Sequence, residues 1–176
     1  KPMSQSLQDL NIAGEFHQFI THLSDLASKK DRMPFIGREK ELEAVLETLQ
    51  RKLKKNIILV GRPGVGKTAL ITELAKRINC GKVPGYLRGK VILELALDSF
   101  LYSRKSSDLL VKDFEKLFLQ IMGNHDRVIL FLDELQLQSV VSTEKLRKTN
   151  HIHGILRAHI AALDLTIIAA ATPEDY

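Results

Sequence analysis

Residues 61–68 read Gly-Arg-Pro-Gly-Val-Gly-Lys-Thr and match the pattern G-x-x-x-x-G-K-[ST]. Glycines allow left-handed backbone angles, so several N–H groups of such a loop can point inward at phosphate oxygens. We expect Lys67 to reach the β- and γ-phosphates of a nucleotide, and the Thr68 hydroxyl to ligate Mg²⁺. The residues predicted to bind the nucleotide here are Arg62, Pro63, Gly64, Val65, Gly66, Lys67, Thr68 and Ala69.

An acidic pair, Asp133-Glu134, closes the apolar run of residues 128–132. Asp133 is expected to hold Mg²⁺ directly or through water, as the second acidic element of such sites. Glu134 is expected to orient and polarise the attacking water as a general base. The alternative is a pair of exposed carboxylates at the end of a strand, and the phosphate-binding loop favours the functional interpretation.

Thr172 ends another apolar run, residues 166–171. Its hydroxyl could bond the γ-phosphate or the attacking water, or it could simply cap the strand end. Together the patterns predict Lys67, Glu134 and Thr172 as catalytic residues, and Thr68 and Asp133 as ligands of the metal.

Four short, β-branched apolar runs predict buried parallel strands, and they are residues 57–60, 91–95, 128–132 and 166–171. Segments of helical period lie between them. This alternation predicts an α/β fold, a three-layer αβα sandwich with a mostly parallel sheet. Ligands in such sheets bind beyond the carboxyl ends of the strands. The glycine-rich loop, the acidic pair and Thr172 all follow strands, so we expect them on one rim.

Apolar spacing at Phe16, Phe19, Ile20, Leu23 and Leu26 predicts one amphipathic helix ahead of this region. The proline in Met-Pro-Phe-Ile-Gly, residues 33–37, then breaks the pattern. A helical period resumes at residue 39 and runs toward the first strand. We therefore divide the chain into residues 1–30, an N-terminal helix or linker, and residues 31–176, the nucleotide-binding domain.

The composition of the 176-residue chain is that of an ordinary folded domain, with 44% hydrophobic and 27% charged residues. No run of about 18 apolar residues predicts a membrane span. The single cysteine, Cys80, excludes an intrachain disulfide and suits the cytoplasm. The net charge is +5, but the densest basic group, residues 51–55, follows a predicted helix and has no interleaved aromatic residue. We interpret it as a solvated helix end and do not expect nucleic-acid binding.

With these motifs, the sequence resembles the AAA+ ATPases, and more closely the first nucleotide-binding domain of the Clp chaperone family, the ClpB-like unfoldases and disaggregases. The resemblance covers about residues 23–176. Beyond the phosphate-binding loop, it rests on Pro-Phe-Ile-Gly-Arg-Glu at 34–39, Gly-Lys-Val-Pro at 81–84, Leu-Phe-Leu-Asp-Glu at 130–134 and Ala-Thr-Pro-Glu-Asp-Tyr at 171–176.

The resemblance implies that Phe35 and Ile36 line the base pocket for ATP or ADP and that Thr172 is the first sensor residue. It implies a P-loop NTPase fold, the AAA+ large subdomain, ending before the last strand and the helical lid. In the family the strand before the phosphate-binding loop is central; in this chain we expect it at a sheet edge. The family forms hexameric rings that hydrolyse Mg-ATP between subunits and act on protein substrates, so we expect weak turnover from this chain alone.

One departure concerns the aromatic pore loop of the family, which should fall between Asp98 and Phe114. Residues 103–110 contain no aromatic side chain, and Tyr102 lies too early. Three functions therefore stay open: an ATPase module of a Clp-like remodelling chaperone, a nucleotide-gated switch or scaffold that recruits partners without threading substrate, and a DNA-associated AAA+ protein. The altered pore region favours the second, and intact Lys67, Asp133 and Glu134 favour the first. Salt-sensitive DNA binding would identify the third.

Overall fold

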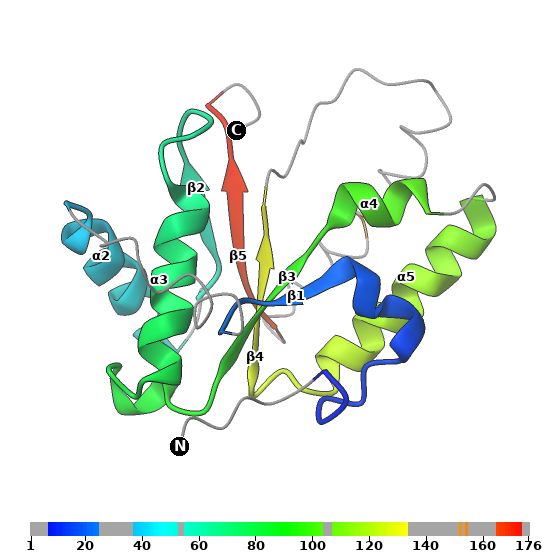
Figure 1. Cartoon of the computed structure of the whole chain (residues 1–176), viewed down its shortest axis with the longest axis horizontal. Coiled ribbons are helices and arrows are strands. Elements are labelled where there is room, and N and C mark those ends of the chain that lie inside the picture. The colour runs from blue at the N-terminus through cyan, green and yellow to red at the C-terminus, as the bar shows by residue number, and fades with distance from the viewer. Residues whose placement is uncertain are drawn as a thin grey trace.

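The computed structural model describes residues 7–24, 37–52, 55–103, 107–133, 152, 154 and 165–173. Their centre is a five-stranded sheet of order β1-β3-β4-β5-β2 (Figure 1). The strands are β1 (Ile20–His22), β2 (Ile57–Val60), β3 (Val91–Leu95), β4 (Val128–Leu132) and β5 (Thr166–Ala171). Strands β2 to β5 pair in parallel, and β1 pairs antiparallel with β3. The four predicted strands and the mostly parallel sheet are confirmed.

Helices cover both faces of the sheet, which gives the predicted three layers. Figure 1 shows α2 and α3 on one side, and α4, α5 and η1 on the other. Their bounds are η1 (Gly14–Phe19), α2 (Glu39–Gln50), α3 (Lys67–Asn79), η2 (Gly85–Leu87), α4 (Leu97–Tyr102) and α5 (Ser107–Met122). The short helix α4 was not predicted. Most of the helix expected after residue 151 lies outside the described residues.

The position of β4 inside the sheet explains why its sequence is apolar at every residue. Ile129 and Phe131 pack in the cluster beneath α2 and α3, whereas Val128, Leu130 and Leu132 pack in the cluster beneath α5. All five side chains are buried. A strand between two helical layers has no solvent face, so a continuous apolar run replaces the alternating pattern.

The amphipathic helix expected around Phe16 to Leu26 is wrong. Its described part instead forms the 3-10 helix η1 and the edge strand β1, in which Ile20 pairs with Leu95, and only Leu23 and Ser24 after β1 are α-helical. Phe16 and Phe19 are three residues apart, so both fit the same face of a 3-10 helix and both are buried. Leu26 lies outside the described residues. The division of the chain at residue 30 stays a prediction.

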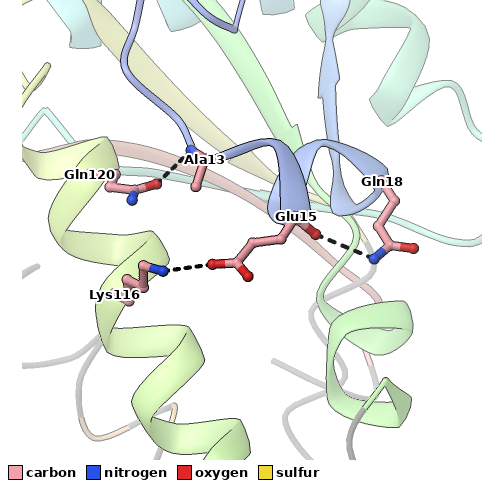
Figure 2. Close-up of polar contacts among 5 residues, drawn as sticks. All are labelled: Ala13, Glu15, Gln18, Lys116 and Gln120. Carbon is pink, nitrogen blue, oxygen red and sulfur yellow. Dashed lines mark hydrogen bonds and ion pairs between the residues drawn. The ribbon is translucent and has the colours of Figure 1, made fainter.

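Polar contacts join this N-terminal segment to α5 (Figure 2). The Ala13 N–H donates to Gln120 Oε1 at 2.9 Å, and Lys116 Nζ lies 2.7 Å from Glu15 Oε1. Asn124 Nδ2 also donates to the Leu10 carbonyl at 2.8 Å. Residues more than 100 positions apart in the sequence are thereby held side by side.

Strand β2 is an edge strand, as expected for this chain, and its neighbour among the described strands is β5. Ile58 and Val60 on one of its faces are 54% and 46% exposed. At its start, Asn56 Oδ1 accepts a hydrogen bond of 2.8 Å from the Ile167 N–H. The strand that leads into the glycine-rich loop is thus positioned by β5. Across the described parts of the chain, no helix has the length and apolar character needed to cross a membrane.

Candidate nucleotide-binding site

The glycine-rich loop begins where β2 ends and is tied to the end of β5. The Gly61 N–H donates to the Ala171 carbonyl at 3.1 Å, and the Val65 N–H donates to the Arg62 carbonyl at 3.3 Å. Gly64 and Gly66 have φ angles of +76° and +89°. Side-chain-bearing residues rarely adopt these angles, so both glycines are required by the backbone path of the loop.

Helix α3 starts directly at the end of the loop. Its N-cap residue is Gly66, which has no side chain to accept hydrogen bonds from the N–H groups of the first turn. The helix is 13 residues long and has no acidic residue in its first turn. Its amino terminus therefore carries unshared N–H donors and a positive dipole end, which together favour an anion.

Lys67 folds back over the loop that precedes it. Its Nζ donates to the Gly61 carbonyl at 2.5 Å and to the Arg62 carbonyl at 3.2 Å. The ammonium group thus lies against the loop and is held by the loop's own carbonyl oxygens. A lysine in this position can exchange these acceptors for the oxygens of a bound phosphate.

Thr68 and Asp133 meet across the rim of the sheet. The Thr68 hydroxyl donates to Asp133 Oδ2 at 2.5 Å, although the two residues are 65 positions apart. Asp133 directly follows β4, and Thr68 lies in the first turn of α3. A hydroxyl oxygen beside a carboxylate is the hard oxygen-donor set that Mg²⁺ prefers, so these residues fit that ion.

Thr172 follows β5 on the same rim. It is half-buried, and the preceding residue, Ala171, accepts the hydrogen bond from Gly61. The convergence expected for the loop, Asp133 and Thr172 is therefore present in the fold. Phe35, Ile36 and Glu134 lie outside the described residues.

Sequence reasoning gave Arg38 no role, yet its side chain lies against the loop. A Cβ atom built on Gly66 would be 3.8 Å from the Arg38 guanidinium carbon and 3.9 Å from the Ala69 Cβ. Arg38 is the N-cap residue of α2, which places the start of that helix beside the start of α3. The only sequence signal was its place directly after Gly37 in the segment that carries the family resemblance.

The family described as "AAA ATPase domain" matches residues 34–161. This match covers most of the chain and includes the loop, Arg38 and Asp133, so the chain belongs to the AAA ATPase domain family. Its five-stranded, mostly parallel sheet with the glycine-rich loop between β2 and α3 is the P-loop NTPase fold.

Among its relatives, the chain resembles the Clp chaperones. It is 30% identical over 177 residues to the chaperone protein ClpB of Corynebacterium efficiens, covering 98% of this chain and 20% of the relative. It is 33% identical over 164 residues to the Clp protease ATP-binding subunit ClpE of Streptococcus pneumoniae, covering 93% and 21%. The chain thus spans about a fifth of the length of these relatives.

Solved structures of Hsp104 also resemble the chain. A complex of Saccharomyces cerevisiae Hsp104 with ADP superposes with a TM-score of 0.74 at 27% identity, over 92% of this chain and 27% of that one. A closed state of Hsp104 with ATPγS and casein gives a TM-score of 0.76, also at 27% identity, with the same two coverages. The predicted resemblance to ClpB-like AAA+ proteins is therefore confirmed.

Proposed function

We propose that this chain binds ATP with Mg²⁺ and serves as the ATP-hydrolysing module of a Clp-type protein-remodelling chaperone. The observation that carries the proposal is the Thr68–Asp133 contact of 2.5 Å beside a loop that holds Lys67 over its own carbonyls. Three elements, α3, β4 and the loop, bring these side chains to one place. The solved Hsp104 structures that resemble the chain hold ADP or ATPγS, which supports the nucleotide assignment.

The residues proposed to bind the nucleotide contact different parts of it. The N–H groups of Gly64, Gly66 and the first turn of α3 bind the phosphate oxygens. Lys67 gives up the Gly61 and Arg62 carbonyls and contacts the β- and γ-phosphates. Phe35 and Ile36 line the base pocket, and Arg62, Pro63, Val65 and Ala69 shape the loop around the phosphates.

The residues for hydrolysis follow strands β4 and β5. Thr68 and Asp133 hold Mg²⁺, which when bound neutralises the charge that develops on the phosphate oxygens. Glu134 accepts a proton from the attacking water as general base, and Thr172 orients that water or the γ-phosphate. These groups would act only when they meet at one rim, and the contact of Thr68 with Asp133 supports that arrangement.

The proposed working state is a ring of identical subunits, as a hexamer in the cytoplasm, that acts on protein substrates. Residues 31–176 would form the nucleotide-binding domain, and residues 1–30 would lead into it. An arginine supplied by a neighbouring subunit accelerates phosphoryl transfer by roughly 10³–10⁵ in related enzymes. We therefore expect slow hydrolysis by the isolated chain, and nucleotide binding is the direct test.

The test is calorimetry with ATP and Mg²⁺ on the chain, on Lys67→Ala and on Lys40→Ala. Charge-assisted hydrogen bonds contribute about 1.5–3 kcal/mol, so Lys67→Ala should weaken binding by roughly 10- to 150-fold. Lys40 is an exposed lysine of α2 and serves as the matched control, with unchanged affinity expected. Equal binding by the chain and by Lys67→Ala would refute the assignment of the loop.

A second variant separates hydrolysis from a switch that only binds nucleotide. Glu134→Gln should keep the affinity for ATP and abolish turnover of the ring-forming protein, because the amide cannot accept the proton of the attacking water. If turnover by the parent protein is absent while binding is tight, the nucleotide-gated scaffold replaces the enzyme as the better description.

A further inference from the structure

A separate pocket lies at the amino-terminal edge of the sheet, opposite the glycine-rich loop. Its volume is about 150 Å³, and buried side chains of Leu49 and Ile129 form part of its wall. Lys55, Lys90, Thr166 and Gln50 line the same pocket. The pocket therefore combines an apolar wall with two cationic side chains and a hydroxyl.

The strands explain how these residues come together. Lys90 directly precedes β3, Lys55 lies two residues before β2, and Thr166 begins β5. Thr166 is in register with Ile129 near the start of β4. The glycine-rich loop follows the other end of the same strands, so a five-residue strand, about 16 Å at 3.3 Å per residue, separates the two sites.

Two positive charges share this pocket, and no carboxylate lines it among the described residues. Lys90 Nζ is fixed by a 2.6 Å hydrogen bond to the backbone carbonyl of Asp126. Burial lowers the pKa of Lys90, and repulsion from Lys55 lowers it further, against a weaker opposing effect of Asp126. Lys55 and Lys90 line the same pocket, so an anion bound there would reduce the repulsion between their charges.

Tyr86 and Gln50 are the other polar residues of the wall, and the hydroxyl of Tyr86 is already engaged. The Tyr86 hydroxyl donates to the Leu46 carbonyl at 2.6 Å, and burial raises the pKa of the phenol. Tyr86 therefore stays neutral and contributes its ring to the wall. Thr166, which also lines the pocket, brings a second hydroxyl group.

We propose that this pocket binds one small oxyanion group, a phosphate or a carboxylate, between the ammonium groups of Lys55 and Lys90. A single water needs roughly 10–15 Å³ of such space, so the pocket has room for an oxyanion together with several waters. The apolar wall of Leu49 and Ile129 lowers the local dielectric and strengthens each charge contact. The site is independent of the nucleotide site proposed above.

The experiment is an NMR titration of the ¹⁵N-labelled 176-residue chain with inorganic phosphate at constant ionic strength. Backbone signals of Lys55, Lys90 and Thr166 should shift along one saturating curve. The pKa of Lys90, followed at its ¹³Cε, should rise when phosphate is bound. Shifts confined to residues 61–68 would overturn the proposal, because they would assign all binding to the glycine-rich loop.

Variants make the assignment specific. Lys55→Gln and Lys90→Gln should each weaken phosphate binding at the pocket at least tenfold, whereas Lys90→Arg, which keeps the charge, should retain it. Lys40→Gln removes one positive charge far from the pocket and should change nothing. An equal loss in Lys40→Gln, or shifts that never saturate, would show a diffuse charge effect and would refute the site.

The same titration distinguishes the two sources of the oxyanion group. Phosphate binding without acetate binding assigns the pocket to phosphate-bearing ligands, and the reverse assigns it to carboxylates. Binding of neither anion at the signals of Lys90 and Thr166 overturns the proposal. Because each site has its own backbone signals, failure at the pocket leaves the test of Lys67 unaffected.

Discussion

The Thr68 hydroxyl donates a hydrogen bond to Asp133 Oδ2 over 2.5 Å, which links the first turn of α3 to the end of β4. Both side chains were predicted as Mg²⁺ ligands from separate motifs, and the fold brings them into direct contact. A bound cation would replace the hydroxyl proton as the partner of the carboxylate, so the two residues should act as a coupled pair.

This coupling is measurable with Thr68→Ala, Asp133→Asn and the double variant. Each single change should reduce the gain in ATP affinity that Mg²⁺ provides, measured by calorimetry with Mg²⁺ and with EDTA. Groups in direct contact typically show interaction energies of about 0.5–3 kcal/mol in such a cycle. Thr48→Ala, a change on α2 whose hydroxyl bonds the Ala44 carbonyl, is the control. Purely additive effects would show that the two residues do not share one ion.

Gly66→Ala should disturb the loop through the backbone alone. The added Cβ would meet no atom closer than 3.8 Å, but φ at this position is +89°. The left-handed region costs a residue with a side chain about 1–2 kcal/mol. We expect a loss of stability of that size by urea denaturation, together with weaker ATP binding. Gly85→Ala, where no atom lies within 4 Å and φ is not positive, should be close to neutral.

Phe114→Ala should be among the more destabilising changes in the cluster beneath α5. The Phe114 ring lies 5.6 Å from that of Phe100 and 5.8 Å from that of Phe118, and its side chain is fully buried. Removal of a buried phenylalanine costs about 3–5 kcal/mol, which thermal or urea unfolding detects easily. Leu119 lies on the same helix but is 65% exposed. A loss for Leu119→Ala as large as that for Phe114→Ala would contradict the assigned faces of α5.

The contact between Glu15 and Lys116 predicts a pH effect with a definite sign. The hydrogen bond and charge of Glu15 raise the pKa of Lys116 above its ordinary value of 10.5. A lysine with a raised pKa in the folded state stabilises the fold below pH 10.5 and loses this contribution as the pH rises through the folded-state pKa. Glu15→Gln should return the pKa of Lys116, followed by NMR at its ¹³Cε, toward the ordinary value.

Glu41→Gln, on the exposed side of α2, is the control for this titration. It should leave the pKa of Lys116 unchanged. An unchanged value in Glu15→Gln as well would mean that the contact drawn in Figure 2 does not persist in solution. Because both side chains are about half exposed, high salt should also weaken the effect.

The parts of the fold that were predicted correctly are those in which the local sequence pattern reflects a local physical requirement. Residues 128–132 and 167–171 lie in strands buried between two helical layers, where every position is apolar, so the pattern is read directly. The loop was predicted because its glycines allow a backbone geometry that few other residues adopt, and because Lys67 follows them at the spacing that a phosphate-binding lysine requires. That Thr68, Asp133 and Gly61 converge followed from the rule that parallel strands end on one edge.

The parts that sequence missed depend on tertiary pairing. Phe16, Phe19 and Ile20 fit a helical period, but the free edge of β3 recruits Ile20 into a strand, and the local pattern does not encode that edge. The contact of Arg38 with the loop depends on how α2 packs beside α3. The pocket at Lys90 gathers residues from four places in the chain, none of which forms a motif.

The sheet order also sets when the chain can build its loop. Asn56, just before β2, is bonded to Ile167, 111 positions later, and β5 is the neighbour of β2 among the described strands. On a ribosome adding about 5–20 residues per second, roughly 6–22 s would pass between the synthesis of β2 and the synthesis of β5, the strand that anchors the loop. During that interval the apolar side chains of β2 have no partner strand. The nucleotide site should therefore form only after β5 has been synthesised.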